Sequence, residues 1–125
     1  MIPHISDIQA EVAREWGIRK RDIISPRRYR PYVVPRHIAM WLSYELTTAS
    51  YSMIGRLFER DHTTVMHGVR NARKILRRCM ATRRQALNVL QRIEAMKYRC
   101  AVVGCVNTAR PGKDVCAEHV AGENR

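Results

Sequence analysis

The chain has 125 residues, with 23 lysines and arginines against 11 aspartates and glutamates, and its formal net charge is +12. This length favours one compact domain, or a small domain with an appendage, and excludes a large multidomain enzyme. The charge makes nucleic acid the leading partner, while a hydrophobic content of 46% excludes a disordered basic tail.

The N-terminal part of the chain predicts one helix followed by a basic loop. Apolar spacing places the helix over residues 7–16, where Ser6 with Gln9 fits a capping box and Gly17 fits a C-terminal stop. Residues 18–35 are expected to form a short turn and then a loop, because their three prolines disfavour a long helix.

Helical spacing continues through the rest of the first hundred residues. We expect a helix over residues 35–46 that starts at its proline, a short helix over 51–58 with Ser50 as its cap, a helix capped by Asp61, and a last helix over 83–97. The pattern leaves open whether the last two form one long helix with a bend. The expected core residues are Ile38, Trp41, Leu42, Leu46, Ile54, Leu57, Phe58, Val65, Val69, Ala72, Leu76, Ala86, Leu87, Leu90 and Ile93.

The basic surplus is clustered in the sequence. Residues 1–98 carry a balance of +11, and residues 99–125 are nearly neutral. Seven basic side chains lie within residues 19–36 and seven within residues 70–84. A solvated basic face would explain either cluster alone. Two clusters that flank one helix-rich segment favour a rim that binds phosphates.

Two short helices joined by Glu59 and Arg60 fit a helix-turn-helix, in which the second helix enters the major groove. Carboxylate, imidazole and hydroxyl groups on its first turn can hydrogen-bond to base edges, and a threonine methyl can contact thymine. The same Asp-x-x-Thr pattern is an ordinary helix cap, so the pattern alone leaves both interpretations open. The side chains concerned are Asp61, His62, Thr63 and Thr64.

Residues 54–67 read Ile-Gly-Arg-Leu-Phe-Glu-Arg-Asp-His-Thr-Thr-Val-Met-His. This stretch resembles the signature of the C-terminal DNA-binding domain of the DnaA family of bacterial replication initiators. Residues 35–42 and the Trp-Gly-Ile turn at 16–18 are also similar, so that the resemblance covers roughly residues 4–79. The Arg-Asp-His-Thr-Thr-Val core is its most specific part. The resemblance implies an all-α helix-turn-helix fold and binding of double-stranded DNA at DnaA-box-like sites.

The resemblance also implies roles for individual residues. An arginine of the basic loop enters the neighbouring minor groove, with Arg28 as the best match and Arg27 as the next, and Arg36 matches a position that contacts the DNA backbone. Tyr44 stands where the family often has a lysine, and the single Glu59 replaces a Gly-Gly link. The positions that match the base-reading residues are Arg60, Asp61, His62, Thr63 and Thr64.

We expect a DnaA-like domain over residues 1–81, a basic amphipathic helix over 82–98 and a tail over 99–125. No Gly-x-x-x-x-Gly-Lys-Ser/Thr loop occurs, so no ATP binding is expected, and the chain lacks the family's ATPase motor. No catalytic set of residues is recognisable, so an enzyme is not expected. His37 and His67 are expected to be surface or contact residues.

The tail contains Cys100-x4-Cys105-x10-Cys116-x2-His119. Zinc prefers four tetrahedral sulfur and nitrogen ligands, so this spacing predicts a closed, structural Zn²⁺ site, with four unconnected residues as the alternative. The tail also resembles small zinc-binding knuckles appended to phage-type proteins, which favours a prophage origin.

The sequence therefore favours a protein that regulates replication initiation or transcription by occupying DnaA-box-like sites, with the replication initiator or other regulatory proteins as possible further partners. We expect it in the cytoplasm, associated with the nucleoid and not with a membrane, since no apolar run of spanning length occurs. Two alternatives remain: a protein-interaction adaptor that keeps the fold without specific DNA reading, and, less favoured, a part of a phage nuclease system.

Overall fold

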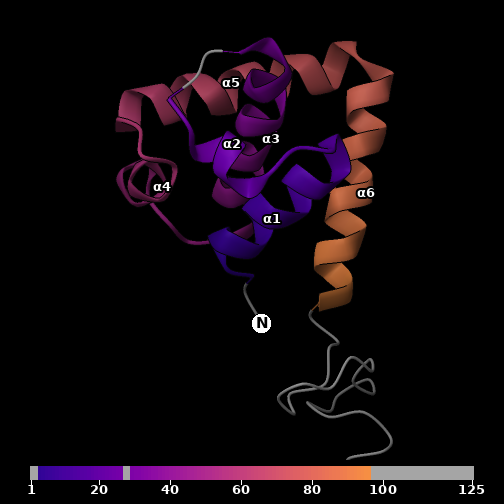
Figure 1. The fold of residues 1–125 in the computed structure, drawn as a ribbon, viewed down its shortest axis with the longest axis horizontal. Coiled ribbons are helices and arrows are strands. Elements are labelled where there is room, and N and C mark those ends of the chain that lie inside the picture. Colours follow the sequence, from indigo (N-terminus) through magenta and orange to yellow (C-terminus); the bar gives the residue numbers. More distant parts are fainter. Residues whose placement is uncertain (1–2, 27–28, 97–125) are drawn as a thin grey trace, which may run out of the picture.

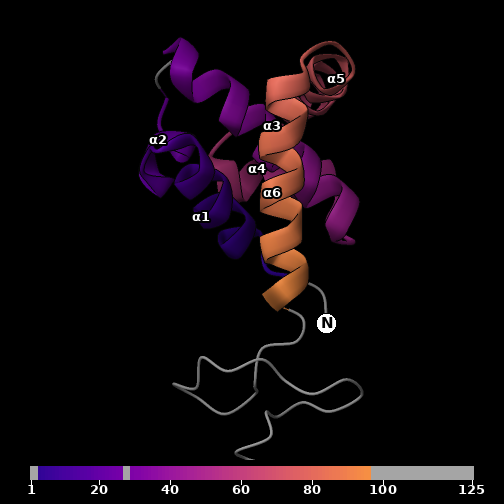
Figure 2. The same ribbon diagram turned by 90° about the vertical axis from the view of Figure 1, so that its right-hand side faces the viewer.

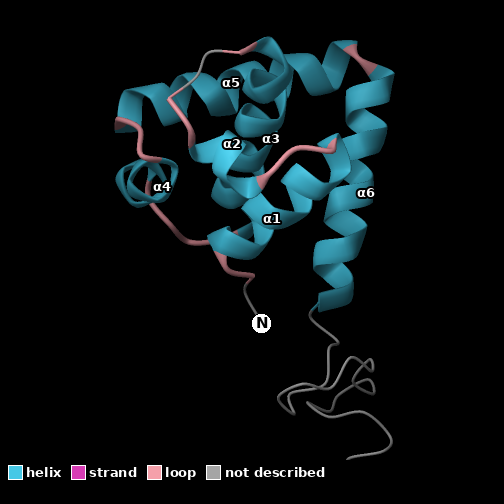
Figure 3. Ribbon diagram, viewed as in Figure 1, coloured by secondary structure: helices cyan, strands magenta, loops and turns pink. Residues whose placement is uncertain are grey.

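The computed structural model describes residues 3–26 and 29–96. In this part of the chain there are six helices and no strand, which confirms the all-α prediction (Figures 1 and 3). The helices are α1 (Ile5–Trp16), α2 (Lys20–Ile24), α3 (Arg30–Leu46), α4 (Tyr51–Phe58), α5 (His62–Arg78) and α6 (Met80–Met96).

The six helices enclose one apolar core. In Figure 1, α5 lies across the top of the molecule, α4 is seen end-on beside its N-terminal end, and α6 descends from its C-terminal end. Turning the molecule brings α6 to the front, with α1 beside it (Figure 2). The largest fully buried side chains come from every helix: Phe58, Ile8, Ile23, Ile38, Met40, Leu42, Ile54, Ile93, Val12, Val65, Val69 and Val89.

The start of α1 differs from the expected capping box. The helix begins at Ile5, and His4 occupies its N-cap without a side-chain hydrogen bond. Gln9 is buried instead, and its Nε2 donates to the Leu57 carbonyl at 3.0 Å, because the packing of α1 against α4 takes this side chain away from the helix end. The predicted stop at Gly17 is confirmed by its left-handed φ of 68°.

The region expected to be a turn and a loop holds more helix than its prolines suggested. α2 forms over Lys20–Ile24, and α3 begins at Arg30, five positions before the expected Pro35. Pro31 lies in the first turn of α3, where a missing N–H costs no helical bond. Pro35 removes the single bond that its N–H would make to the residue 31 carbonyl, and it is tolerated inside the helix.

The short helix α4 has the expected bounds and cap, since the Ser50 hydroxyl accepts the Met53 N–H at 3.2 Å. Ile54 and Phe58 face the core as predicted. Leu57 was wrongly placed there: it is 50% exposed, because it shares the outer face of α4 with Met53.

The alternative of one long helix after residue 61 is wrong, because α5 ends at Arg78 and Cys79 leaves the helical conformation. Arg83 covers the end of α5, with its guanidinium donating to the carbonyls of Leu76 and Arg77. α6 starts at Met80, three residues earlier than expected.

Helix α6 joins the same core as the other helices. Ala86, Val89 and Ile93 are buried in it, whereas the predicted core residue Leu87 is 51% exposed. None of the described helices combines the length and the apolar character that crossing a bilayer requires.

Candidate nucleic-acid interface

A tight turn sets the angle between α4 and α5. Glu59 adopts the left-handed conformation, with φ of 52°, and the Arg60 N–H returns to the Gly55 carbonyl at 2.8 Å. A Cβ at Gly55 would stand 2.5 Å from the Arg60 carbonyl oxygen, so the turn can close against α4 only over a glycine. The single Glu59 therefore makes the short link that the sequence implied.

The first turn of α5 presents four exposed side chains from Asp61, His62, Thr63 and Thr64. Asp61 occupies the N-cap, as expected, but its carboxylate accepts the Thr63 hydroxyl and makes no capping bond to the helix. That hydrogen bond, together with the nearby His62, lowers the pKa of Asp61. Its carboxylate is thus a charged acceptor, suited to an amino group on a base edge.

Arg36 lies elsewhere than the resemblance implied. It is 5% exposed, and its guanidinium donates to the carbonyls of Ile23 at 2.6 Å, Asp22 at 3.0 Å and Ser25 at 3.0 Å. Burial, with repulsion from Arg60, lowers the pKa of Arg36 to about 10. A buried side chain with its donors on backbone carbonyls has little surface left for a phosphate of DNA.

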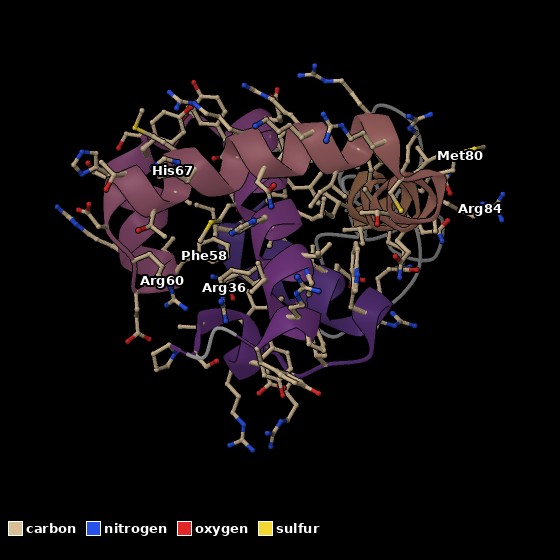
Figure 4. The ribbon with its side chains drawn as sticks, turned by 90° about the horizontal axis from the view of Figure 1, so that it is seen from above. Arg36, Phe58, Arg60, His67, Met80 and Arg84 are labelled. Carbon is tan, nitrogen blue, oxygen red and sulfur yellow. The ribbon has the colours of Figure 1, made fainter. Side chains whose placement is uncertain are left out.

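Arg60 is also bound to the protein itself. Its Nη1 donates to the Ile24 carbonyl at 3.0 Å and the Phe58 carbonyl at 3.1 Å, and its Nη2 donates to Ser25. Partial burial lowers the pKa of Arg60, although Glu59 opposes this effect. Figure 4 shows Arg36 and Arg60 side by side next to Phe58. The Arg60 guanidinium thus contacts the protein, whereas the resemblance implied a contact with a base.

A hollow of about 490 Å³ is lined by residues of α3, by the turn before α5 and its first residues, and by Pro26, which follows α2. Arg27 and Arg28, the predicted minor-groove residues, lie outside the described residues and directly follow Pro26, which lines this hollow. The lining residues are Pro26, Val33, Arg36, His37, Met40, Glu59, Arg60 and Thr64.

His37, expected at the surface or in a contact, is half-buried between α3 and α5. Asn71 Nδ2 donates to its Nδ1 at 2.8 Å. Burial, with the charge of Arg36, lowers the pKa of His37 and favours a neutral ring. Gly68 makes room for this packing, because a Cβ there would stand 2.6 Å from the sulfur of Met40.

The exposed face of α5 continues from its first turn as a basic surface, which consists of His67, Arg70, Lys74, Arg77 and Arg78. Arg73 lies beside it, bound to Glu45 at 2.8 Å and 6.0 Å from the ring centre of Tyr44. An arginine thus stands next to the position where the family often has a lysine. The sequence predicted a basic cluster over residues 70–84 but gave no sign that Arg73 within it is paired with Glu45.

The predicted zinc ligands Cys100, Cys105, Cys116 and His119 lie outside the described residues. Within residues 3–26 and 29–96, no group of three histidine, cysteine or acidic side chains could hold a metal ion.

A capped short helix, a tight turn and a second helix with a polar, exposed first turn define the class of helix-turn-helix DNA-binding domains. Comparison with known proteins places the chain within this class. The family described as "Bacterial dnaA protein helix-turn-helix" matches residues 5–72, and the chain belongs to this family.

The curated relatives are chromosomal replication initiator proteins named DnaA. The protein of Ruegeria sp. (strain TM1040) is 49% identical over 72 residues, which cover 57% of this chain and 15% of the relative. That of Cereibacter sphaeroides (strain ATCC 17029) is 46% identical over 88 residues, 70% of this chain and 18% of the relative. That of Caulobacter vibrioides (strain NA1000) is 51% identical over 67 residues, which cover 53% of this chain and 14% of the relative. The chain thus spans under a fifth of the length of these relatives.

Proposed function

We propose that this protein binds double-stranded DNA at DnaA-box-like sites and so regulates replication initiation or transcription. The observation that carries the proposal is the first turn of α5, which presents Asp61, His62, Thr63 and Thr64 to solvent and uses none of them for core packing. Membership of the DnaA helix-turn-helix family supports a duplex as the ligand, and the names of the relatives support a role in replication initiation.

We assign different parts of the surface to affinity and to sequence choice. The exposed basic residues of α5 supply contacts to phosphates, which position the protein on any duplex. Asp61, His62 and Thr63 supply the hydrogen bonds to base edges, and Thr64, exposed in the same turn, shares that task.

A histidine substitution tests the base-reading role. His62→Ala should weaken binding to a DnaA box by about tenfold, because one or two base contacts are worth roughly 1–3 kcal/mol. Binding to a scrambled duplex should change little. His4→Ala, which removes another exposed histidine at the start of α1, is the matched control. Electrophoretic mobility shifts with both duplexes provide the measurement; equal losses on the two duplexes would contradict the assignment.

The same assay separates this function from the main alternative. A protein-interaction adaptor with the same fold would retain a box and a scrambled duplex equally at every salt concentration. Specific retention of the box by the unmodified protein therefore supports DNA regulation, and its absence supports the adaptor.

Arg28, with Arg27 beside it, is proposed as the minor-groove contact on the strength of the family resemblance. Narrow A·T-rich minor grooves attract arginine. Arg28→Ala should therefore lower affinity for a box with A·T-rich flanks more than for one with G·C-rich flanks, measured by fluorescence anisotropy. An equal loss of affinity for both boxes, or no loss for either, would contradict the role.

The cysteines and histidine of the tail are proposed as ligands of a structural Zn²⁺, because their number and spacing fit tetrahedral coordination. Metal analysis of the purified protein should find one zinc per chain. Cys105→Ser together with Cys116→Ser should remove it, while Cys79→Ser should not. A metal-free wild-type protein that does not take up zinc would refute the site.

A further inference from the structure

The end of α2 is held by two arginines from other parts of the fold. The last carbonyls of a helix accept no hydrogen bond within the helix itself, and in the five-residue α2 this applies to a large part of the element. Arg36 donates to the carbonyls of residues 22, 23 and 25, and Arg60 donates to those of residues 24 and 25. Each of these four consecutive carbonyls therefore accepts a hydrogen bond from a guanidinium.

The two arginines connect α2 to the base-reading helix. Arg36 projects from α3, and Arg60 immediately precedes the N-cap of α5 (Figure 4). The Arg60 side chain also donates to the Phe58 carbonyl at 3.1 Å, so the same guanidinium ties the end of α4 to the end of α2. The first turn of α5 thus has a fixed position relative to Ser25 and Pro26, across the hollow.

The chemistry of this contact requires arginine. A planar guanidinium with five donors can bridge several carbonyls at once, whereas a lysine ammonium is a compact point charge. The two cations also lie close enough for Arg60 to repel Arg36. The arrangement is kept despite this repulsion, and the carbonyls at the negative end of α2 offset it.

We propose that Arg60, together with Arg36, is a positioning residue. The two arginines hold the end of α2 and the first turn of α5 in a fixed relative position, so that both contact DNA as a single preformed surface. Preorganisation of this kind removes the ordering cost that binding would otherwise include. The inference rests on the proposed function, and it replaces base contact by Arg60 with an indirect role.

A panel of DnaA boxes, each with one base pair changed, distinguishes the two roles. Arg60→Ala should weaken binding to the intact box by about tenfold or more. Arg60→Ala should also reduce the loss of affinity that each base change causes. This reduction should extend over the whole box, including base pairs that the first turn of α5 does not contact. Arg60→Lys should fail to restore these penalties. Arg14→Ala removes an exposed arginine of α1 and serves as the control for charge.

Three outcomes of the panel would overturn the proposal. A base-reading Arg60 would lose discrimination at one base pair only, and a residue without a positioning role would behave like Arg14→Ala. General destabilisation would lower the active fraction of protein and leave the ratios between boxes unchanged, which would also count against positioning.

A measurement without DNA separates this proposal from the proposed function. Amide hydrogen exchange by mass spectrometry should show that Arg60→Lys increases exchange over residues 20–25 at least about fivefold, since charge-assisted hydrogen bonds are lost, with no change over residues 84–93. Unchanged exchange over residues 20–25 would overturn the positioning role of Arg60, even if the protein binds DnaA boxes. If the wild type does not distinguish a DnaA box from a scrambled duplex, the proposed function fails. Hydrogen exchange alone then tests whether Arg60 positions α2.

Discussion

Glu59 is in a backbone conformation that favours glycine, since its φ is 52°. The left-handed region costs a non-glycine residue roughly 1–2 kcal/mol. A glycine avoids this strain, but its greater freedom in the unfolded chain offsets part of the gain in stability. Glu59→Gly should therefore raise the free energy of unfolding by roughly 0.5–1 kcal/mol, measured by urea denaturation.

Glu59→Gln is the matched control for this prediction, because it removes the charge and keeps the strained backbone. It should leave stability nearly unchanged. Both variants should bind DNA of any sequence more tightly, since each removes an acid beside the base-reading turn. A Glu59→Gly protein no more stable than Glu59→Gln would show that the turn is not strained.

His37 should make stability depend on pH. Burial and Arg36 lower its pKa in the folded protein below the value of about 6.5 for an unfolded chain. Below pH 6.5 the unfolded state therefore binds the proton first. The free energy of unfolding should be highest above pH 6.5 and fall as the pH decreases through the folded-state pKa, by at most about 1.4 kcal/mol per pH unit.

Replacement of two histidines tests this dependence. His37→Gln should flatten the curve of unfolding free energy between pH 5 and 7. His67→Gln, which removes an exposed histidine of α5, should leave the slope as in the wild type. Equal slopes for wild type and His37→Gln would contradict the prediction.

Residue roles could be predicted from the sequence where they depend on near neighbours. Ser50 caps α4 and Gly17 ends α1 through bonds to residues within a few positions. The roles of Arg36 and Arg60 could not be predicted, because their acceptor carbonyls on α2 lie between 11 and 36 positions away. Leu57 was misplaced for a related reason: the partner of α4 decides which of its apolar residues are covered.

At the scale of elements, α6 is fastened to α1 by one arginine. Arg92 donates from Nε to Glu11 at 2.8 Å and from Nη1 to Glu15 at 2.9 Å, and both carboxylates are mostly buried. Arg92→Ala would leave two mostly buried acids without this partner and should lower the free energy of unfolding by about 2 kcal/mol. Thermal unfolding followed by circular dichroism measures the loss.

The Arg73–Glu45 pair provides the control, since it has a similar distance of 2.8 Å but side chains 43% and 42% exposed. Exposed ion pairs contribute little, so Arg73→Ala should cost less than about 0.5 kcal/mol. Similar losses for the two variants would mean that burial does not set the strength of the α1–α6 contact.

The existence of five of the six described helices could be predicted from the sequence, whereas only some of their boundaries could, such as those of α4. Apolar spacing identified the segments that became α1, α3, α4, α5 and α6. α2 was missed because its stability depends on arginine donors from elsewhere in the chain. The start of α3 was misplaced because Pro31, inside the first turn, is as well suited to a helix start as Pro35.

At the scale of the whole molecule, the surplus positive charge is distributed over different faces. Arg70 and Lys74 extend the exposed face of α5 from its base-reading turn, while Arg84 lies at the other end of α5, on α6 (Figure 4). Each arginine or lysine that meets a phosphate adds about 0.9 to the slope of log affinity against log salt concentration. Location, and not charge alone, should therefore decide the salt dependence.

Arg70→Ala should reduce this slope by about 1 on both a DnaA box and a scrambled duplex, because phosphate contacts do not depend on sequence. Arg84→Ala removes the same charge and should leave the slope unchanged, and His62→Ala should lower affinity for the box at a constant slope. Fluorescence anisotropy titrations at four salt concentrations give all three values. Equal slopes for Arg70→Ala and Arg84→Ala would show that the net charge of the whole protein, rather than one face of α5, sets its attraction to DNA.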